Sequence, residues 1–162
     1  MSVSASGYLR IGATDVDAWM DFGTDVLGLM DARRDDAGGA RFLRMDDHPF
    51  RLMIEPADAD GLLACGFEFP GEDAFSRTCE AVAEAGHAVT SGSAEEAARR
   101  GVTAFATTTD PSGNTIELYW GRELDYRPLV SPQGVQGFVT TYGQTGDLGF
   151  GHMVLPAPEF DA

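Results

Sequence analysis

The sequence predicts an α+β domain made of two similar βαβββ modules. Three observations support this class: strand-like segments of alternating polarity are numerous, helical patterns are few, and the order of one strand, one helix and several strands occurs twice. We place the modules at residues 5–57 and 61–121, within one domain at residues 1–123. A chain of 162 residues can bury a substantial hydrophobic core.

A strand over residues 7–14 opens the first module, and a helix follows it. Thr14 or Asp15 is expected to cap this helix, and Asp17 completes a spacing like that of a capping box. Gly28 marks the predicted end of the helix, because glycine readily adopts the left-handed conformation found there. The apolar face recurs at intervals of three and four residues, at Val16, Trp19, Gly23 and Val26.

Three short strands are expected to complete the first module, at residues 29–34, 41–45 and 50–55. Each alternates roughly between apolar and polar residues, as a strand with one buried face does. Stretches rich in Asp, Gly or Pro separate these segments and indicate turns. After the helix the spacing of apolar residues changes from three or four to two, which predicts strands and gives the order βαβββ.

The second module repeats this order with one additional short helix. A strand at residues 62–69 precedes a helix at residues 72–85, which Gly86 is predicted to end. Ser93 begins a capping box for the short helix, which is expected to end at Gly101. The remaining strands are predicted at residues 87–90, 102–108 and 114–120.

The composition is strongly acidic, and every basic residue is an arginine. With 26 acidic and 11 basic residues, the formal net charge is −15, which opposes binding to nucleic-acid phosphates. The absence of lysine excludes a lysine Schiff base and a lysine-dependent phosphate loop. No apolar run approaches the roughly 20 residues of a membrane helix, and the amino terminus lacks a secretory pattern, so we expect a cytoplasmic protein.

Cysteine and histidine are scarce. Cys65 and Cys79 form no CxxC pair, which argues against a disulfide scaffold and against a thiolate metal cluster. We expect both to be small buried hydrophobic residues. The three histidines, His48, His87 and His152, lie far apart in the sequence, so most of the chain cannot form a histidine-rich metal site.

A third module is predicted to begin near residue 151. Residues 7–18 align without gaps with residues 151–162, and four positions are identical. The segment at residues 124–148 is rich in Pro, Gly, Gln and Thr and is expected to connect two domains. Residues 149–162 would then be the first strand of a truncated second domain. Because this strand would expose apolar side chains, we expect the isolated chain to associate.

Five segments carry a resemblance to a known family: GYLRIGATDVDAW at 7–19, DVLGL at 25–29, ARRGVT at 98–103, DPSGNTIELYWG at 110–121 and GFGHMV at 149–154. They resemble the type I extradiol ring-cleavage dioxygenases of the vicinal oxygen chelate superfamily, the group that contains dihydroxybiphenyl dioxygenases. The resemblance covers nearly the whole chain. It implies that the two βαβββ modules form an open, barrel-like cup.

The resemblance also implies where the iron site of such an enzyme lies. In this family the second domain holds Fe(II) with two histidines and one glutamate, and the first domain is a non-catalytic copy. By resemblance, Tyr8 and Ala64 occupy the positions of the two histidines in this first domain, and Glu117 keeps the carboxylate. No metal and no catalytic residue are therefore expected within the first domain. His152 would be the first iron ligand of the second domain, and Val154 would line its ring pocket.

The activity that the resemblance implies for the complete enzyme is meta cleavage of a catechol-type aromatic ring. Two histidines and one carboxylate leave positions on Fe(II) open for the catechol and for dioxygen. We expect a homo-oligomer that binds neither nucleic acid nor membranes. The residues that select one catechol over another would lie beyond Ala162, so the ring that is cleaved is left open.

Several candidate residues also have ordinary structural explanations. Glu117 is expected to be solvated or hydrogen-bonded, since it shares a strand face with tyrosine. His48 and His87 lie in a turn and at a helix exit, where solvated roles are common. Arg99 and Arg100 follow two glutamates at helical spacing, which predicts charge pairs along the short helix.

Two other function classes are left open. One is a stand-alone, metal-free protein of the bleomycin-resistance type that sequesters a cationic small molecule, which the acidic charge would suit. The other is a metalloenzyme of the glyoxalase or small extradiol type, in which two chains share metal ligands. The GFGHMV segment counts against the first, and the scarcity of histidine counts against the second.

Overall fold

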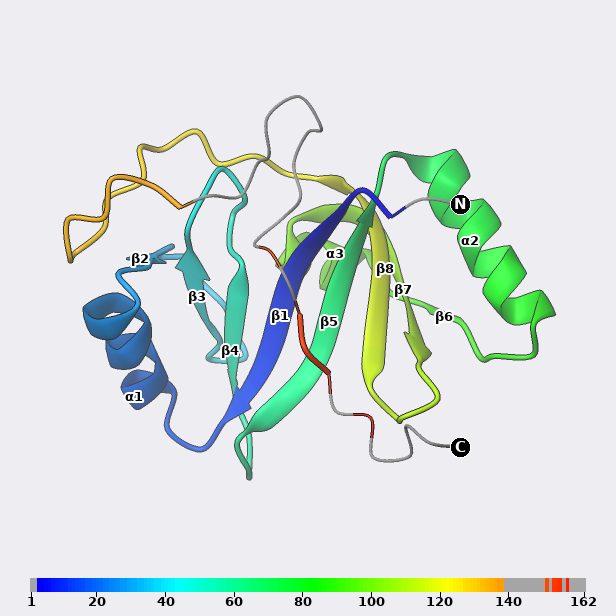
Figure 1. Ribbon diagram of the computed structural model, residues 1–162, viewed down its shortest axis with the longest axis horizontal. Helices are drawn as coiled ribbons and strands as arrows, with labels where there is room; N and C mark the ends of the chain where they lie inside the picture. Colours follow the sequence, from blue (N-terminus) through cyan, green and yellow to red (C-terminus); the bar gives the residue numbers. More distant parts are fainter. Residues whose placement is uncertain (1–2, 139–150, 152, 156, 158–162) are drawn as a thin grey trace.

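The computed structural model describes residues 3–138, 151, 153–155 and 157, and the described strands form a single eight-stranded mixed sheet (Figure 1). The strand order is β2-β3-β4-β1-β5-β8-β7-β6, so each module contributes one half of the sheet. β1 and β5 lie side by side at the centre and are antiparallel. β4 pairs with β1, and β8 pairs with β5, both in parallel. The sheet curves into an open cup and does not close into a barrel.

The predicted elements are found in the predicted order. The strands are β1 Ala5–Ala13, β2 Met30–Asp31, β3 Arg41–Arg44, β4 Leu52–Pro56, β5 Gly61–Phe69, β6 Thr90–Ser91, β7 Val102–Thr109 and β8 Thr115–Arg122. The helices are α1 Val16–Asp21, the π-helical turn η1 Phe22–Val26, α2 Glu72–Glu84 and α3 Ala94–Arg100. β2 and β6 are shorter than expected. Both lie at the edges of the sheet, where a strand has a neighbour on one side only.

The helix ends follow the capping signals in the sequence, but one residue of the predicted apolar face lies elsewhere. Asp15 caps α1 by accepting a hydrogen bond from the amide of Ala18, whereas Thr14 binds Asp60. For α3, the capping box at Ser93 is confirmed, as is a left-handed residue at Gly101. The expectation that Val26 shares the apolar face of the first helix was wrong, because Val26 is 67% exposed. The π-helical turn changes the rotation per residue and moves Val26 off that face.

Two apolar clusters lie on opposite sides of the first half of the sheet. Phe42 and Met53 point into the cup and pack in the cluster that contains Tyr8 and Tyr119. Their chain neighbours Leu43 and Ile54 point the other way, in the cluster that α1 covers. This alternation follows from the pleat of β3 and β4.

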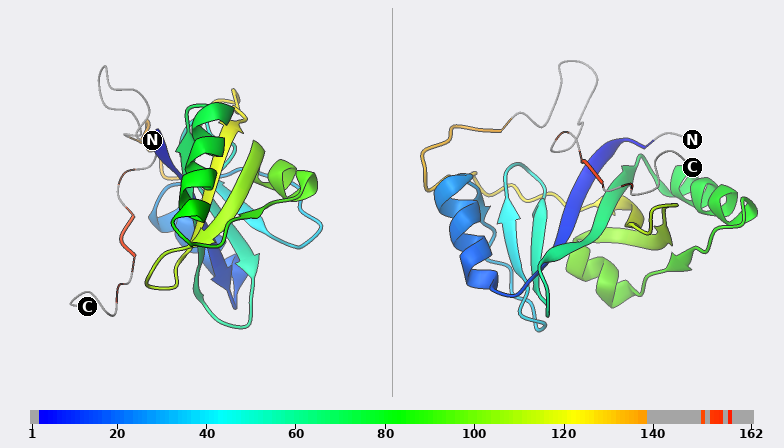
Figure 2. Two further views of the ribbon diagram at one scale, coloured as in Figure 1. Left: turned by 90° about the vertical axis from the view of Figure 1, so that its right-hand side faces the viewer. Right: turned by 60° about the horizontal axis from the view of Figure 1, so that its bottom comes forward.

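The helices cover different parts of the sheet. α1 packs on β3 and β4, α2 packs on β5 and β8, and α3 packs on β7. Figures 1 and 2 show α1 and α2 near opposite ends of the sheet, with β1 and β5 between them. Within the described residues, none of the helices is both long enough and apolar enough to cross a membrane.

We predict that Gly66→Ala destabilises the domain by about 1–3 kcal/mol, because a methyl group at this position overpacks the core. A Cβ atom on Gly66 would lie 2.6 Å from Cζ of Tyr8, a buried ring that also stacks on Tyr119. Gly61→Ala in the same strand is the matched control, since its Cβ would meet nothing within 4 Å. Urea unfolding of both variants tests this. Equal unfolding midpoints would contradict the close contact between β5 and Tyr8.

Candidate functional site

The cup contains a continuous chain of six alternating charges. In order they are Asp36, Arg99, Glu55, Arg10, Glu117 and Arg100. They come from both modules: the β2–β3 loop, β4 and β1 of the first, and α3 and β8 of the second. Three carboxylates and three guanidinium groups balance, so this chain of side chains has no net formal charge.

The two glutamates occupy matching positions in the two modules. Glu55 is paired with Gly12 where β4 runs parallel to β1, and Glu117 is paired with Gly66 where β8 runs parallel to β5. Each therefore comes from the outer strand of a parallel pair, opposite a glycine of a central strand. The internal repeat of the sequence thus places one carboxylate in each half of the cup.

Glu117 is the most enclosed member, with a side chain only 1% exposed. Its Oε1 accepts hydrogen bonds from Nη1 of Arg10 and Nη2 of Arg100, each at 2.7 Å. Its Oε2 accepts one from the hydroxyl of Tyr8 at 2.6 Å and one from Nε of Arg100 at 2.8 Å. Two hydrogen bonds on each oxygen use the acceptor capacity of the carboxylate.

The other half of the chain of charges is built in the same way. One carboxylate oxygen of Glu55 accepts a hydrogen bond from Nε of Arg10 at 2.7 Å, and the other accepts one from Nη1 of Arg99 at 3.0 Å. Arg99 then reaches Asp36 through Nε at 2.6 Å. Because each guanidinium group offers several donors in one plane, one arginine can bind two carboxylates at once.

The surroundings favour the charged forms of Glu117, Arg10 and Asp36. Burial alone would raise the pKa of Glu117, but the hydrogen bonds and charge of Arg100, the hydrogen bond from Tyr8 and the charge of Arg10 together lower it below the ordinary value of 4.5. Burial opposes the charge on Arg10, yet its hydrogen bond to Glu55 and the nearby carboxylates raise its pKa. The hydrogen bond from Arg99 lowers the pKa of Asp36.

Tyr8 is held as a neutral phenol. Burial is the main reason that its pKa is raised well above the ordinary value of 10.0, and the negative charge of Glu117 adds to the effect. Its ring stacks on Tyr119 with the centroids 5.2 Å apart. A neutral hydroxyl that donates to a carboxylate is a positioning contact, not a source of protons near neutral pH.

The three positions predicted to descend from a metal site do not fit a metal. Tyr8 and Glu117 lie together but are hydrogen-bonded to each other. Ala64 is buried opposite Arg10 and so faces the cup, where its small side chain leaves room for the guanidinium group and offers no ligand atom. Two guanidinium charges beside Glu117 would repel a cation. Among the described residues, no group of three or more His, Cys, Asp or Glu is placed to hold a metal ion.

Other expectations about single residues have mixed outcomes. The expectation of charge pairs along α3 for Arg99 and Arg100 was wrong, because both side chains leave the helix for the carboxylates in the cup. His48 is buried rather than solvated, with Nε2 2.6 Å from Nη1 of Arg122, whereas His87 is exposed as expected. Cys65 is a buried small residue as predicted, and burial raises the pKa of its thiol to about 11.

The predicted second-domain residues have little structural description. His152 lies outside the described residues. Val154 is described and is 93% exposed. Its predicted role in a ring pocket stays a prediction.

Sequence reasoning missed Arg10, Glu55 and Asp36. A signal was available for Arg10, which stands in the otherwise apolar strand sequence YLRIGA, because a charge in such a strand is buried only with a partner. A second signal was the dipeptide Ile-Glu, which occurs in the last strand of each module at Glu55 and Glu117. No local pattern points to Asp36, whose partner Arg99 lies 63 residues away in the chain.

We predict that Glu117→Gln lowers the free energy of unfolding by about 3–5 kcal/mol, because it leaves buried arginine charges without their full partner. Glu123→Gln is the control. Glu123 is 61% exposed and lies 3.8 Å from Arg34, so its change should stay within about 0.5 kcal/mol. Chemical denaturation measures both. A loss for Glu117→Gln as small as that of the control would contradict the burial of this carboxylate.

We also predict that stability falls at both ends of the pH scale. The folded pKa of Glu117 lies below its ordinary value of 4.5, so its contribution is present above about pH 4.5 and is lost as pH falls through the folded pKa. The folded pKa of Tyr8 lies above 10.0, so its contribution is present below pH 10 and is lost as pH rises beyond it. Urea midpoints against pH should show a weaker acid loss for Glu117→Gln and a weaker alkaline loss for Tyr8→Phe. Profiles that match the parent protein would overturn these assignments.

Known proteins match this chain closely. A family model described as "Dihydroxybiphenyl dioxygenase BphC D1" matches residues 7–57. An iron-dependent extradiol dioxygenase of Rhodococcus jostii (strain RHA1) is 39% identical over 162 residues, which is 100% of this chain and 52% of the relative. A 3-methylcatechol 2,3-dioxygenase of Pseudomonas putida (strain F1) is 38% identical and is covered to 54% of its length. A crystal structure of catechol 2,3-dioxygenase superimposes with a TM-score of 0.86 at 25% identity, over 99% of this chain and 52% of that one.

The chain spans about half the length of the curated relatives it matches. The matched fold is the open sheet of two βαβββ modules found in extradiol dioxygenases of the vicinal oxygen chelate type. The matching family model is that of a first domain, labelled D1. Over its whole length the chain is therefore similar to about half of an extradiol ring-cleavage dioxygenase, and residues 7–57 match the family model of the first domain.

Proposed function

We propose that this chain is the non-catalytic amino-terminal domain of an Fe(II)-dependent extradiol dioxygenase that meta-cleaves a catechol-type aromatic ring. The observation that carries the proposal is the match of the whole chain to about half of the Rhodococcus iron-dependent extradiol dioxygenase. The relatives' names specify 3-methylcatechol and biphenyl-2,3-diol as substrates. Those compounds share two adjacent ring hydroxyls, which is the substrate class that we propose here.

The proposed division of the chain follows the sequence. Residues 1–123 form the domain, residues 124–148 connect it, and residues 149–162 begin the catalytic domain. Within that last segment, His152 is the proposed first iron ligand and Val154 the proposed pocket residue. The GFGHMV motif and the gap-free internal alignment support this assignment. Fe(II) in the catalytic domain would supply chelation of the catechol and activation of dioxygen.

The role of the first domain in this proposal is structural. The position of a metal in its cup is filled by the charges of Arg10 and Arg100, which bind Glu117 from both modules of the fold. A cup filled in this way has no open ligand positions for a catechol. That the whole enzyme is a cytoplasmic homo-oligomer stays a prediction.

The alternative of a stand-alone protein that sequesters a cationic small molecule has less support. A cationic ligand would need a free carboxylate in the cup, but Glu117 and Glu55 are already bound by Arg10, Arg99 and Arg100. The acidity of the chain as a whole equally serves to keep a protein surface dispersed.

We predict that the protein isolated from its source cell has about twice the mass of this chain and contains iron. Within that longer protein, His152→Ala should lose iron and ring cleavage, because one ligand of three is removed. Tyr8→Phe is the control and should keep both, since the hydroxyl that it removes donates to Glu117 inside the first domain. Mass spectrometry, metal analysis and oxygen uptake with catechol measure the outcome. A native product of this mass without iron would favour the stand-alone binding protein.

A further inference from the structure

We propose that a pocket beside β2 binds a small monocarboxylate with an apolar body, through the guanidinium group of Arg33. The pocket has a volume of about 490 Å³ and lies between β2 and the segment that follows β8. It is called the lateral pocket below. Its binding properties follow from six of its lining residues: Met30, Asp31, Arg33, Arg127, Val130 and Pro132. The lateral pocket needs neither iron nor a second domain, so it stands apart from the proposed function.

The segment after β8 forms the outer wall of the lateral pocket. Figure 1 shows this segment, coloured yellow to orange, crossing from β8 to the side of β2. Two hydrogen bonds attach it there. The amide of Val130 donates to Sδ of Met30 at 3.3 Å, and the hydroxyl of Ser131 donates to the carbonyl of Gly28 at 2.6 Å. The wall is therefore held against the first module by the fold itself.

Arg33 supplies a positive charge that the protein does not neutralise. The other charged groups of the lateral pocket are paired: Asp125 binds Arg127 at 2.5 Å, and Arg41 binds Asp31 at 2.8 Å. Among the described residues, the guanidinium group of Arg33 has no hydrogen bond or ion pair, and its side chain is exposed. The lateral pocket thus carries one positive charge without a counterpart.

The backbone of Arg33 is strained. Its φ angle of 49° lies in the left-handed region, and Arg33 is the single described residue other than glycine with a positive φ. The amide of Arg33 donates to Oδ1 of Asp31 at 2.8 Å, which supports this turn. Asparagine or glycine would adopt the same conformation with less strain. Strain of this kind is concentrated at ligand sites, which agrees with a binding role for the arginine.

The lining of the lateral pocket defines the class of its ligand. Met30, Val130 and Pro132 offer apolar surface, and small-molecule sites are typically apolar with a few placed polar groups. A guanidinium group binds a planar carboxylate through two parallel hydrogen bonds. One free positive charge matches one negative charge, and the net charge of −15 opposes a phosphate or a dicarboxylate. An aromatic or aliphatic monocarboxylate therefore fits best.

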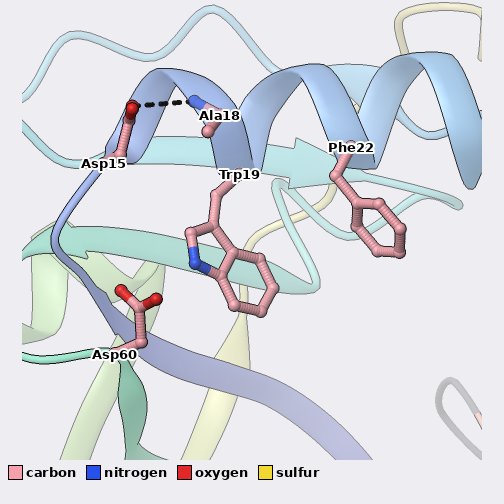
Figure 3. Close-up of a pocket in the computed structure, with 5 residues that line it drawn as sticks. All are labelled: Asp15, Ala18, Trp19, Phe22 and Asp60. Atoms are coloured by element: carbon pink, nitrogen blue, oxygen red, sulfur yellow. Dashed lines mark hydrogen bonds between the residues drawn. The ribbon is translucent and has the colours of Figure 1, made fainter.

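A second cavity of the protein has the opposite chemistry. It has a volume of about 210 Å³ and is lined by Asp15, Ala18, Trp19, Phe22 and Asp60. Figure 3 shows the two aromatic side chains projecting from the helical segment, with two carboxylates and no basic group among the residues drawn. A carboxylate ligand would be repelled there. This cavity is therefore an internal control for binding to the lateral pocket.

Titration of the full isotope-labelled chain with benzoate, followed by NMR, tests the lateral pocket. The amide signals of Arg33 and Val130 should shift in a saturable way, and those of Trp19 and Phe22 should not. Benzamide has the same shape without the charge, so it should bind about tenfold more weakly. Acetate has the charge without the apolar body and should also bind weakly. No saturable shift with benzoate, or equal affinity for benzamide, would overturn the proposal.

Arg33→Asn tests the guanidinium group itself. Asparagine tolerates the left-handed conformation, so the urea midpoint should not fall. The affinity for benzoate should fall about tenfold, because the charge-assisted hydrogen bonds are lost. Arg77→Gln is the matched control, since it removes the same charge from an exposed position on α2 and should leave the affinity unchanged. Equal losses in the two variants would overturn the role of Arg33.

Val130→Asp tests the outer wall. Val130 is 65% exposed, so the substitution should leave the fold intact while it places a carboxylate beside Arg33. Benzoate binding should then be lost, because the new carboxylate repels the ligand and neutralises the arginine. Leu124→Asp is the control, since Leu124 is 42% exposed and does not line the lateral pocket. Parent-like benzoate binding by Val130→Asp would overturn the location of the site.

The remaining outcomes concern other partners of Arg33. If Arg33→Asn lowers the apparent mass of the chain in size-exclusion chromatography, a carboxylate of a second copy is the partner and the small-molecule site is overturned. An unchanged apparent mass together with the loss of benzoate affinity supports the proposal. Iron missing from the longer protein would contradict the proposed function alone, since the benzoate titration uses no metal.

Discussion

The buried carboxylate of Glu117 connects the two modules inside the cup. It joins Arg10 of the first module to Arg100 of the second, with the hydroxyl of Tyr8 as a third partner. Burial of an unpaired carboxylate would cost several kcal/mol, so the cup is stable only when all these partners are present. The same requirement fixes the register of β8 against β5, because a shift of one residue would turn Glu117 out of the cup. One carboxylate thus links the register of β8 to the packing of the two modules.

The chain of charges also explains why the described cup does not fit a metal ion. A metal centre and an arginine cluster satisfy the same carboxylate with positive charge, but an arginine occupies the volume that ligands and substrate would need. Arg10 fills the space beside Ala64, and Arg100 closes over Glu117 from α3. The described interior of the cup is therefore occupied by paired side chains.

The element order was predictable because it is encoded locally. Ser93 and Gly101 define α3 through a capping box and a left-handed end, and both signals were read correctly. The π-helical turn after α1 was not predicted, because the spacing of apolar residues fits an ordinary α-helix equally well. Val26 was therefore placed on the wrong face of the helix. The charged contacts in the cup join residues far apart in sequence, such as Glu55 and Arg99. Local spacing favoured the helical glutamates as partners of Arg99, and only the folded sheet brings the correct carboxylates within reach.

The most direct test of this account is a double-mutant cycle between Arg10 and Glu117, measured as the free energy of unfolding of the chain. Arg10→Met, Glu117→Leu and the double variant each keep the approximate side-chain volume. The account predicts a coupling free energy within the range of roughly 0.5–3 kcal/mol found for residues of one network, with the double variant more stable than the sum of the single losses implies. Additive losses, with no coupling between the two side chains, would contradict the claim that this ion pair holds the two modules together.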